Sequence, residues 1–222
     1  MQRPSSVCSP TACLQQKRWK NFCICSEGNL PLLRSLLMPD FAQSNLSFRM
    51  MAAFIGMRNR LNPPRDMLET EAELKPGSRV LDFGCGPGGH SIAAARIVGP
   101  RGRVFALDIH PLALEMVERT AEKNNLTNIE TIHSDCETEL DTESIDTVLL
   151  YDIYHILSEP ETVLEELNRV LKPEGRLSFS DHHMRDEDIL RSIGNGTGFR
   201  LQSKGGKTLT FLKGGNGEQR NT

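Results

Sequence analysis

The residues with the clearest potential for chemistry lie in one short stretch. Residues 80–83 read Val-Leu-Asp-Phe, residues 84–89 read Gly-Cys-Gly-Pro-Gly-Gly, and residues 91–95 are Ser-Ile-Ala-Ala-Ala. An apolar run, a glycine cluster and a helix-compatible segment in this order predict a strand, a tight loop and a helix start. Because glycine lacks a Cβ, a ligand can approach such a loop closely, and the helix start offers unpaired N–H groups. The stretch is therefore a candidate cofactor site.

Two residues of this stretch indicate which kind of ligand it suits. Gly84, Gly86 and Gly89 satisfy the dinucleotide pattern Gly-x-Gly-x-x-Gly, which by itself is a weak signal. Pro87 removes one N–H that would contact phosphate oxygens, and the carboxylate of Asp82 repels a pyrophosphate. The same carboxylate suits a cationic ligand. S-adenosylmethionine is such a ligand, because it carries a sulfonium and an ammonium group against one carboxylate.

The stretch resembles motif I of the class I S-adenosylmethionine-dependent methyltransferases, which is an acidic residue, any residue and then Gly-x-Gly-x-Gly. The matching positions are Asp82, Gly84, Gly86 and Gly88, with Cys85 among them. The resemblance implies that S-adenosylmethionine is the cofactor and that these five residues bind it. A glycine turn that joins a strand to a helix without any ligand is the alternative.

Two further acidic residues follow predicted strands. Asp108 ends the second strand, where nucleoside-binding α/β folds place an acid that binds the ribose hydroxyls. The alternative role of Asp108 is to cap the next helix. Asp135 follows the third strand, and the resemblance implies that it accepts the exocyclic amine of adenine, with a plain turn aspartate as the alternative. Ile109 and Cys136 are expected to give apolar contacts to the ribose and adenine.

The acceptor residues are expected after the predicted central strand. Residues 151–155, Tyr-Asp-Ile-Tyr-His, stand where the resemblance places groups near the transferred methyl. Asp152 is expected to hold a polar group of the acceptor, and His155 to act as a base near neutral pH. Capping or packing by His155 is the alternative. The Asp-His-His sequence at 181–183 suits a pocket wall better than a metal site, because neighbouring strand residues point to opposite faces.

Strand and helix signals alternate around these residues. The expected strands are 80–83, 103–107, 129–132, 147–151, 176–180, 199–202 and 208–212, and the expected helices are 90–98, 112–124, 160–171 and 185–192. This alternation predicts an α/β fold with right-handed crossovers and a parallel sheet, whose middle strand is the apolar segment 147–151. From Leu74 to Leu212 the order resembles the Rossmann-like class I methyltransferase fold. The resemblance implies a mostly parallel seven-stranded sheet with a reversed last strand.

Shifts in composition divide the chain into four segments. Residues 1–39 are basic and contain several serines, so we expect a disordered extension, a targeting segment or an over-extended start outside the fold. Residues 40–73 predict N-terminal helices, residues 74–213 the methyltransferase domain and residues 214–222 a flexible tail. A transit peptide at the start would direct the protein to an organelle.

The first N-terminal helix is expected over residues 41–61. It carries Leu46, Met50, Phe54 and Met57 near helical spacing. Such a face predicts either core packing or a movable lid over the acceptor. The lid is favoured, because methionine side chains adapt to varied shapes and the short connection after the fifth strand leaves the pocket otherwise uncovered.

Length and composition exclude several classes of protein. The 222 residues, 38% hydrophobic and 25% charged with a formal net charge of −3, are typical of one soluble globular domain with appendages. This charge gives no general affinity for nucleic acid, and no apolar run has the length of a membrane span. Four of the six cysteines lie in the first 25 residues without zinc-site spacing. A reducing, cytoplasmic compartment and no metal cofactor are expected.

These observations predict methyl transfer from S-adenosylmethionine to a small-molecule acceptor, with the enzyme aligning the reactants and excluding water. Residues 171–177 add a resemblance to the quinone-biosynthesis and arsenite methyltransferases. The arsenite enzymes use a set of thiols, and the body of this chain offers only Cys85 and Cys136. A non-catalytic cofactor-binding subunit and a nicotinamide-dependent dehydrogenase are the alternatives. A nucleic-acid adenine methyltransferase is disfavoured, because residues 152–155 lack the Asp/Asn-Pro-Pro-aromatic motif.

Overall fold

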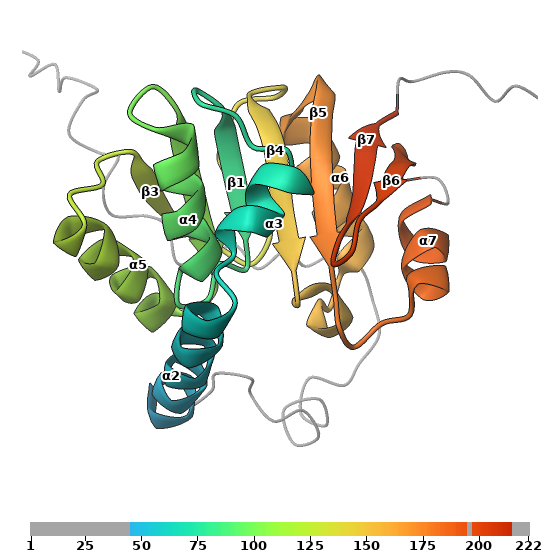
Figure 1. Ribbon diagram of the computed structural model, residues 1–222. Helices are drawn as coiled ribbons and strands as arrows, with labels where there is room; N and C mark the ends of the chain where they lie inside the picture. The colour runs from blue at the N-terminus through green and yellow to red at the C-terminus, as the bar shows by residue number, and fades with distance from the viewer. Residues whose placement is uncertain (1–44, 195–196, 215–222) are drawn as a thin grey trace, which may run out of the picture. The chain divides into compact units, whose positions relative to one another are not determined.

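The computed structural model describes residues 45–194 and 197–214 (Figure 1). All of the described residues belong to one compact unit. The predicted extension at 1–39 and almost all of the predicted tail therefore lie outside the described residues. No helix in the described part is both long enough and apolar enough to cross a membrane.

A seven-stranded sheet forms the centre of the described unit (Figure 1). The strands are β1 (Arg79–Phe83), β2 (Arg103–Asp108), β3 (Ile129–His133), β4 (Ile145–Tyr151), β5 (Leu171–Ser180), β6 (Phe199–Lys204) and β7 (Leu209–Lys213). Their order is β3-β2-β1-β4-β5-β7-β6, and β7 alone runs against the direction of the other strands. The predicted fold is confirmed, including β4 as the middle strand and the reversed last strand.

Helices cover both faces of this sheet. They are α2 (Asn45–Leu61), α3 (Arg65–Thr70), α4 (Gly89–Val98), α5 (Pro111–Lys123), α6 (Pro160–Val170) and α7 (Asp186–Gly194), with a 3-10 turn η1 at Tyr154–Ile156. Neighbouring strand residues point to opposite faces. Val80 accordingly shares a buried cluster with Ala94 of α4, whereas Leu81 shares another with Leu164 of α6. The result is a three-layer arrangement in which the carboxyl ends of the parallel strands lie at one edge.

β5 begins earlier than the sequence predicts. The strand starts at Leu171, which pairs with Ile145, and the pairing with β4 then resumes at Arg176 after an irregularity. The Pro-Glu-Gly segment at 173–175 therefore lies inside β5 instead of separating it from α6. Beyond the irregularity the register is regular and sets Tyr151 beside Ser180. This register matters for the site, because the residues that follow both strands become neighbours.

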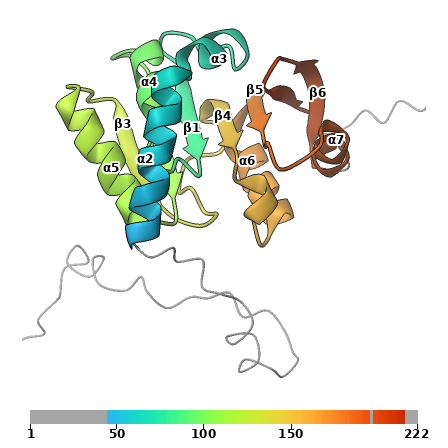
Figure 2. The same ribbon diagram turned by 60° about the horizontal axis from the view of Figure 1, so that its bottom comes forward.

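The N-terminal helix α2 buries a different face from the predicted one. Phe48 and Ala52 are buried and share a cluster with Ala113 of α5, and α2 lies alongside α4 and α5 in Figure 2. The predicted apolar face is exposed at Leu46, Met50, Phe54 and Met57. The interpretation of these four side chains as core is wrong, because spacing defines a face without saying what it contacts. The lid interpretation stays a prediction.

Candidate cofactor and acceptor site

The glycine loop lies between the carboxyl end of β1 and the start of α4. Gly84, Gly86 and Gly88 have φ values of 75°, 51° and 82°, a left-handed region that favours glycine. A Cβ at Gly84 would lie 2.9 Å from the Ile153 side chain, and one at Gly88 would lie 2.6 Å from that of Val117. At Gly86 a Cβ would meet nothing within 4 Å. The loop is thus packed tightly at both ends and has open space at its centre.

Asp108 connects this loop to the end of β2. Its Oδ2 accepts a 2.8 Å hydrogen bond from the N–H of Gly86, and its Oδ1 accepts one of 2.8 Å from the N–H of His110. The alternative role as the cap of α5 falls to His110, whose Nδ1 accepts from the N–H of Leu112 at 3.2 Å. A carboxylate has about four lone-pair sites. Asp108 is half-buried and keeps acceptor capacity for a ligand hydroxyl.

Asp82 is more deeply buried than the sequence suggests. Its side chain is 2% exposed, and Oδ2 accepts a 2.5 Å hydrogen bond from the hydroxyl of Ser91 in the first turn of α4. Burial raises the pKa of Asp82 to about 6. The hydrogen bond from Ser91 lowers this pKa, whereas the charge of Asp108 raises it. A nearby ligand cation would favour its ionised form. Direct contact with such a cation stays a prediction.

The other predicted cofactor residues differ in their access to a ligand. Cys85 is buried, burial raises the pKa of its thiol, and its backbone N–H donates to the carbonyl of Leu107 at 2.9 Å. Ile109 is 58% exposed directly after Asp108. Asp135 is exposed and Cys136 is half-buried beside the end of β3, which pairs with the end of β2. The structure therefore gathers the predicted ribose and adenine residues at one edge of the sheet.

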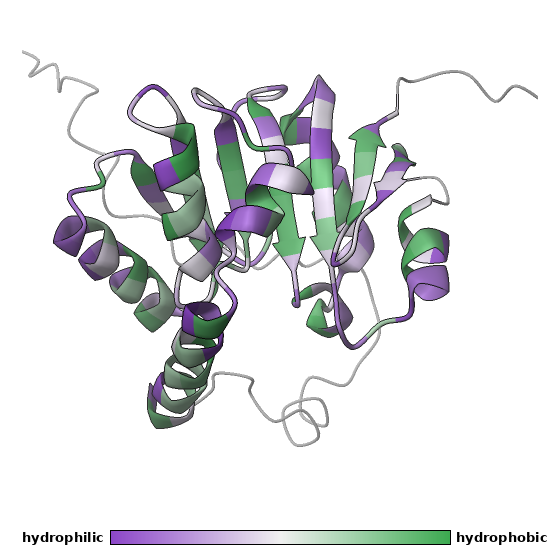
Figure 3. Ribbon diagram, viewed as in Figure 1, coloured by the Kyte–Doolittle hydropathy of each residue, from purple (hydrophilic) through white to green (hydrophobic). Residues whose placement is uncertain are grey.

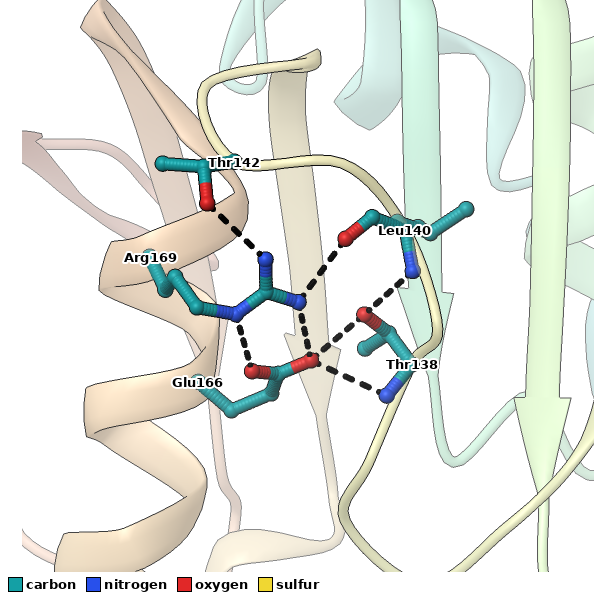
Figure 4. Close-up of polar contacts among 5 residues, drawn as sticks. All are labelled: Thr138, Leu140, Thr142, Glu166 and Arg169. Atoms are coloured by element: carbon teal, nitrogen blue, oxygen red, sulfur yellow. Dashed lines mark hydrogen bonds and ion pairs between the residues drawn. The ribbon is translucent and has the colours of Figure 1, made fainter.

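The loop between β3 and β4 is attached to α6 by a polar network (Figure 4). Arg169 donates to both carboxylate oxygens of Glu166 at 2.7 and 2.9 Å, and to the carbonyl of Leu140 at 2.8 Å. Thr138 donates its N–H and its hydroxyl to Glu166 at 3.0 and 2.6 Å. A bidentate arginine–carboxylate pair fixes orientation as well as charge. The network holds the loop that follows the predicted adenine-binding aspartate.

A cavity of about 590 Å³ opens at the carboxyl ends of β4 and β5 and includes His90, which directly follows the glycine loop. Its walls come from the ends of β4 and β5, the last turn of α2, the prolines before α3, the start of α7 and the turn between β6 and β7. This volume is typical of a small-molecule site. Of the predicted acceptor residues, Asp152 lines the cavity and His155 does not.

Asp152 holds a histidine that the sequence analysis did not select as a base. Its Oδ1 lies 2.7 Å from Nδ1 of His182 and accepts the N–H of His182 at 3.2 Å. Its Oδ2 lies 3.8 Å from a guanidinium nitrogen of Arg58. Asp152 has a φ of 55°, and strained non-glycine residues of this kind cluster at functional sites. Because the carboxylate occupies Nδ1, the second nitrogen of His182 is the one available for proton exchange.

His155 pairs with a different aspartate. Its Nδ1 lies 2.8 Å from Oδ2 of Asp181, which also accepts the N–H of His155 at 3.1 Å. Burial alone would raise the pKa of Asp181, but hydrogen bonds from His155 and His183 outweigh it and lower that pKa. The predicted roles of His155 as base and of Asp152 as acceptor holder stay predictions. Among the described residues, no set of three His, Cys, Asp or Glu side chains is placed to hold a metal ion.

His90 is a wall residue that no sequence pattern singles out. It lies edge-on to Tyr151, with ring centroids 4.9 Å apart. Burial lowers the pKa of His90 to about 4. The charge of Arg58 also lowers this pKa, whereas the charge of Asp152 raises it. His90 is therefore neutral near pH 7. Together with Tyr151, it gives this part of the cavity an aromatic, uncharged surface.

Comparison with known proteins places the chain in a family. The family model described as a methyltransferase domain matches residues 74–200, and the chain belongs to this family. The arsenite methyltransferase of Halobacterium salinarum is 32% identical over 111 residues, which are 50% of this chain and 28% of that protein. The demethylmenaquinone methyltransferase of Geobacillus stearothermophilus is 29% identical over 136 residues, which are 61% of this chain and 58% of that protein.

The solved structures support the same assignment. An S-adenosylmethionine-dependent methyltransferase from Aquifex aeolicus is 26% identical, with a TM-score of 0.61, and the match covers 72% of this chain and 96% of that one. The match to the curated relatives is less complete, because it spans less than two thirds of their length. The predicted resemblance to class I methyltransferases is confirmed.

Proposed function

We propose that the protein transfers a methyl group from S-adenosylmethionine to a small-molecule acceptor. The observation that carries this proposal is the contact between the two halves of the site. Gly84 of the loop packs against Ile153, and Ile153 directly follows Asp152 on the cavity wall. A cofactor on the loop and an acceptor in the cavity would therefore be neighbours. Such alignment is the main contribution that a protein makes to methyl transfer.

The residues at the loop fit this cofactor. Gly86 leaves open space where a ligand would approach the backbone of the loop. Asp108 offers a charged acceptor to the ribose hydroxyls. Asp135 is exposed at the next strand end, where it is proposed to accept the adenine amine. Asp82 supplies a negative field behind the loop for the cationic methionine end. When bound, S-adenosylmethionine supplies a methyl group that its sulfonium makes electrophilic, and the carbon–sulfur bond that breaks leaves S-adenosylhomocysteine as a neutral thioether.

The cavity residues prepare the acceptor. Asp152 orients His182, and Nε2 of His182 accepts a proton from an acceptor hydroxyl or amine whose lone pair attacks the methyl carbon. The proton moves to the imidazole, and the ion pair with Asp152 stabilises the resulting cation. This step serves only acceptors that lose a proton. Arg58 is placed to contact a negative group on the acceptor, because its only ion-pair contact within the described residues is the long one to Asp152.

The cavity and the charge favour a small organic acceptor. A volume of about 590 Å³ admits a molecule of drug size, and a net charge of −3 offers nothing general to nucleic acid. The named relatives act on chemically different acceptors, arsenite and demethylmenaquinone. Within the described residues the thiols do not favour arsenic, because Cys85 is buried and Cys136 lies beside the proposed adenine position. We include a cytoplasmic location and the absence of a nucleic-acid partner in this proposal.

Calorimetry with the purified protein tests the cofactor assignment. S-adenosylmethionine and S-adenosylhomocysteine should each bind at one site, whereas NADH should produce no fluorescence change. Tight NADH binding without binding of S-adenosylhomocysteine would favour the dehydrogenase alternative. Binding of S-adenosylhomocysteine without any methylated product would favour the non-catalytic subunit.

A further inference from the structure

The helix α2 exposes a ridge of large apolar side chains. Figure 3 colours hydrophobic positions along this helix green. This apolar ridge consists of Leu46, Met50, Phe54, Met57 and Leu61, which are between 59% and 76% exposed. Five of the eight large hydrophobic side chains that are exposed in the described part belong to this one helix. Scattered exposed hydrophobic residues need no explanation, but a contiguous set indicates an interaction surface.

The spacing of the apolar ridge places it opposite the buried face. Its members follow one another at intervals of four, four, three and four residues. At about 100° per residue they fall within a stripe roughly 80° wide. Phe48 and Ala52, which pack toward α5, lie on the other side of the helix. In this structure the ridge therefore faces away from the side of α2 that packs on α5.

The charges of α2 surround this ridge with cations. The helix contains Arg49, Arg58 and Arg60 and no acidic residue. By helical periodicity, Arg49 and Arg60 flank the ridge on one side and Arg58 flanks it on the other. All three are exposed, and no ion pair involves Arg49 or Arg60 within residues 45–194 and 197–214. An apolar stripe between flanking arginines is the pattern of a helix that lies in a membrane interface.

The charges on α2 also distinguish between two possible partners of the ridge, a second copy of the chain and a lipid surface. A second copy of the chain that paired ridge to ridge would bring two sets of arginines together without a carboxylate on either helix. An anionic lipid surface instead pairs each guanidinium with a phosphate, while the apolar side chains enter the boundary of the acyl chains. We propose that α2 binds the protein to an anionic lipid surface through the apolar ridge and its flanking arginines.

Binding of α2 to a bilayer would also affect how an acceptor reaches the cavity. Arg58, Asn59 and Asn62, at the end of the same helix, line the 590 Å³ cavity. A protein held on a bilayer through α2 would have the rim of this cavity close to the lipid headgroups. An acceptor dissolved in the membrane could then reach the site without crossing bulk water. The proposal itself concerns the surface of α2 and does not depend on methyl transfer.

Co-sedimentation of the full chain with vesicles tests the proposal. Vesicles of phosphatidylcholine with phosphatidylglycerol should bind the protein about tenfold more tightly than phosphatidylcholine alone, and added salt should weaken the difference. Phe54→Glu with Met50→Glu should reduce binding to anionic vesicles by about tenfold or more. The double change Arg49→Gln with Arg60→Gln should remove the preference for anionic lipid. Leu201→Glu, an exposed apolar residue on β6, is the matched control and should bind as wild type does.

Several results would overturn this proposal. They are the absence of binding to anionic vesicles, equal binding by the Phe54→Glu and Met50→Glu variant, and equal loss in the Leu201→Glu control. A wild-type dimer that Phe54→Glu dissociates, with no vesicle binding, would assign the ridge to a second copy. The variants should keep the wild-type melting temperature and affinity for S-adenosylhomocysteine, because these side chains are exposed. If the double variant unfolds, Leu46→Glu at the other end of the ridge replaces it.

Discussion

The backbone N–H of Gly86 donates a 2.8 Å hydrogen bond to the carboxylate of Asp108. This bond joins the glycine loop after β1 to the end of β2, and the second oxygen of Asp108 holds the N–H of His110 at the start of α5. The acid that the sequence assigns to the ribose therefore also shapes the loop that is proposed to hold the cofactor. Loss of Asp108 should affect binding both through the ligand contact and through the loop.

Replacing Asp108 by Ala should weaken the binding of S-adenosylhomocysteine by about 1–3 kcal/mol, because a partly buried charged acceptor is lost. Asp108→Asn is the matched variant. It keeps the shape of the side chain and one neutral acceptor, so its loss of affinity should be smaller. Calorimetry on both variants, with circular dichroism as the check on folding, measures the effect. An unchanged affinity in folded Asp108→Ala would remove this residue from the site.

The glycine loop gives a contrast between two positions. Gly86→Val should leave the sheet folded and abolish cofactor binding, because the new side chain points into the open space and resists the left-handed φ. Gly88→Val should instead lower the melting temperature strongly, because its Cβ would lie 2.6 Å from Val117. Thermal melts and titrations with S-adenosylhomocysteine separate the two effects. Normal binding by Gly86→Val would mean that the cofactor lies elsewhere.

The raised pKa of Asp82 should make the stability of the protein depend on pH. Its pKa in the folded protein, about 6, lies above the ordinary 3.8, so folding favours the protonated form. The stabilisation is complete below pH 3.8 and is lost as the pH rises through about 6. Near pH 7.5 the buried charge costs up to about 3 kcal/mol, because a tenfold change in a proton-binding constant corresponds to about 1.4 kcal/mol.

Asp82→Asn removes that charge and keeps an acceptor for Ser91. At pH 7.5 the free energy of unfolding of the variant should therefore exceed that of wild type by about 1–3 kcal/mol, so the variant unfolds at a higher urea concentration. The free energies of unfolding of the two proteins should converge toward pH 4. Its affinity for the cationic S-adenosylmethionine should fall. Urea denaturation at several pH values measures the first effect. Equal stability of the two proteins at pH 7.5 would show that the carboxylate carries no such penalty.

The histidines at the end of β5 permit a paired test of the proposed base. His182→Gln should lower kcat by about a hundredfold or more for an acceptor that loses a proton, because the proton acceptor is gone. His183→Gln, a change at the exposed neighbour outside the cavity lining, should leave kcat near the wild-type value. Equal kcat values in the two variants would exclude His182 as the base.

Much of the fold could be predicted from the sequence because its signals are local. A pattern of a few neighbouring residues predicts the glycine loop and each apolar strand. The parallel topology of the sheet follows from the alternation of strands with helices. The position of Asp108 and Asp135 at strand ends follows from the same pattern. The expected role of Asp108 follows from its position at a strand end in nucleoside-binding folds, and that of Asp135 from the family resemblance.

The rest depends on contacts between distant segments. Phe48 and Met50 are both apolar residues of one helix, and only the position of α5 decides that Phe48 is buried. The pairing of Asp152 with His182 depends on the register of β4 and β5, which sets Tyr151 beside Ser180. No local pattern gives that register. The sequence analysis therefore placed residues 181–183 in a pocket wall and His155 as the base, and it gave no sign of the contact between Asp152 and His182.

Transfer of an isotopically labelled methyl group tests the central claim most directly. Wild-type protein is incubated with deuterium-labelled S-adenosylmethionine and the small-molecule fraction of a cell extract, and products are identified by mass spectrometry. The account predicts at least one labelled organic product, formed by wild type and by His183→Gln but not by Gly86→Val. Labelled product formed equally by Gly86→Val would contradict it, and so would the absence of product from wild type in a fraction where an added known methyltransferase forms its own product.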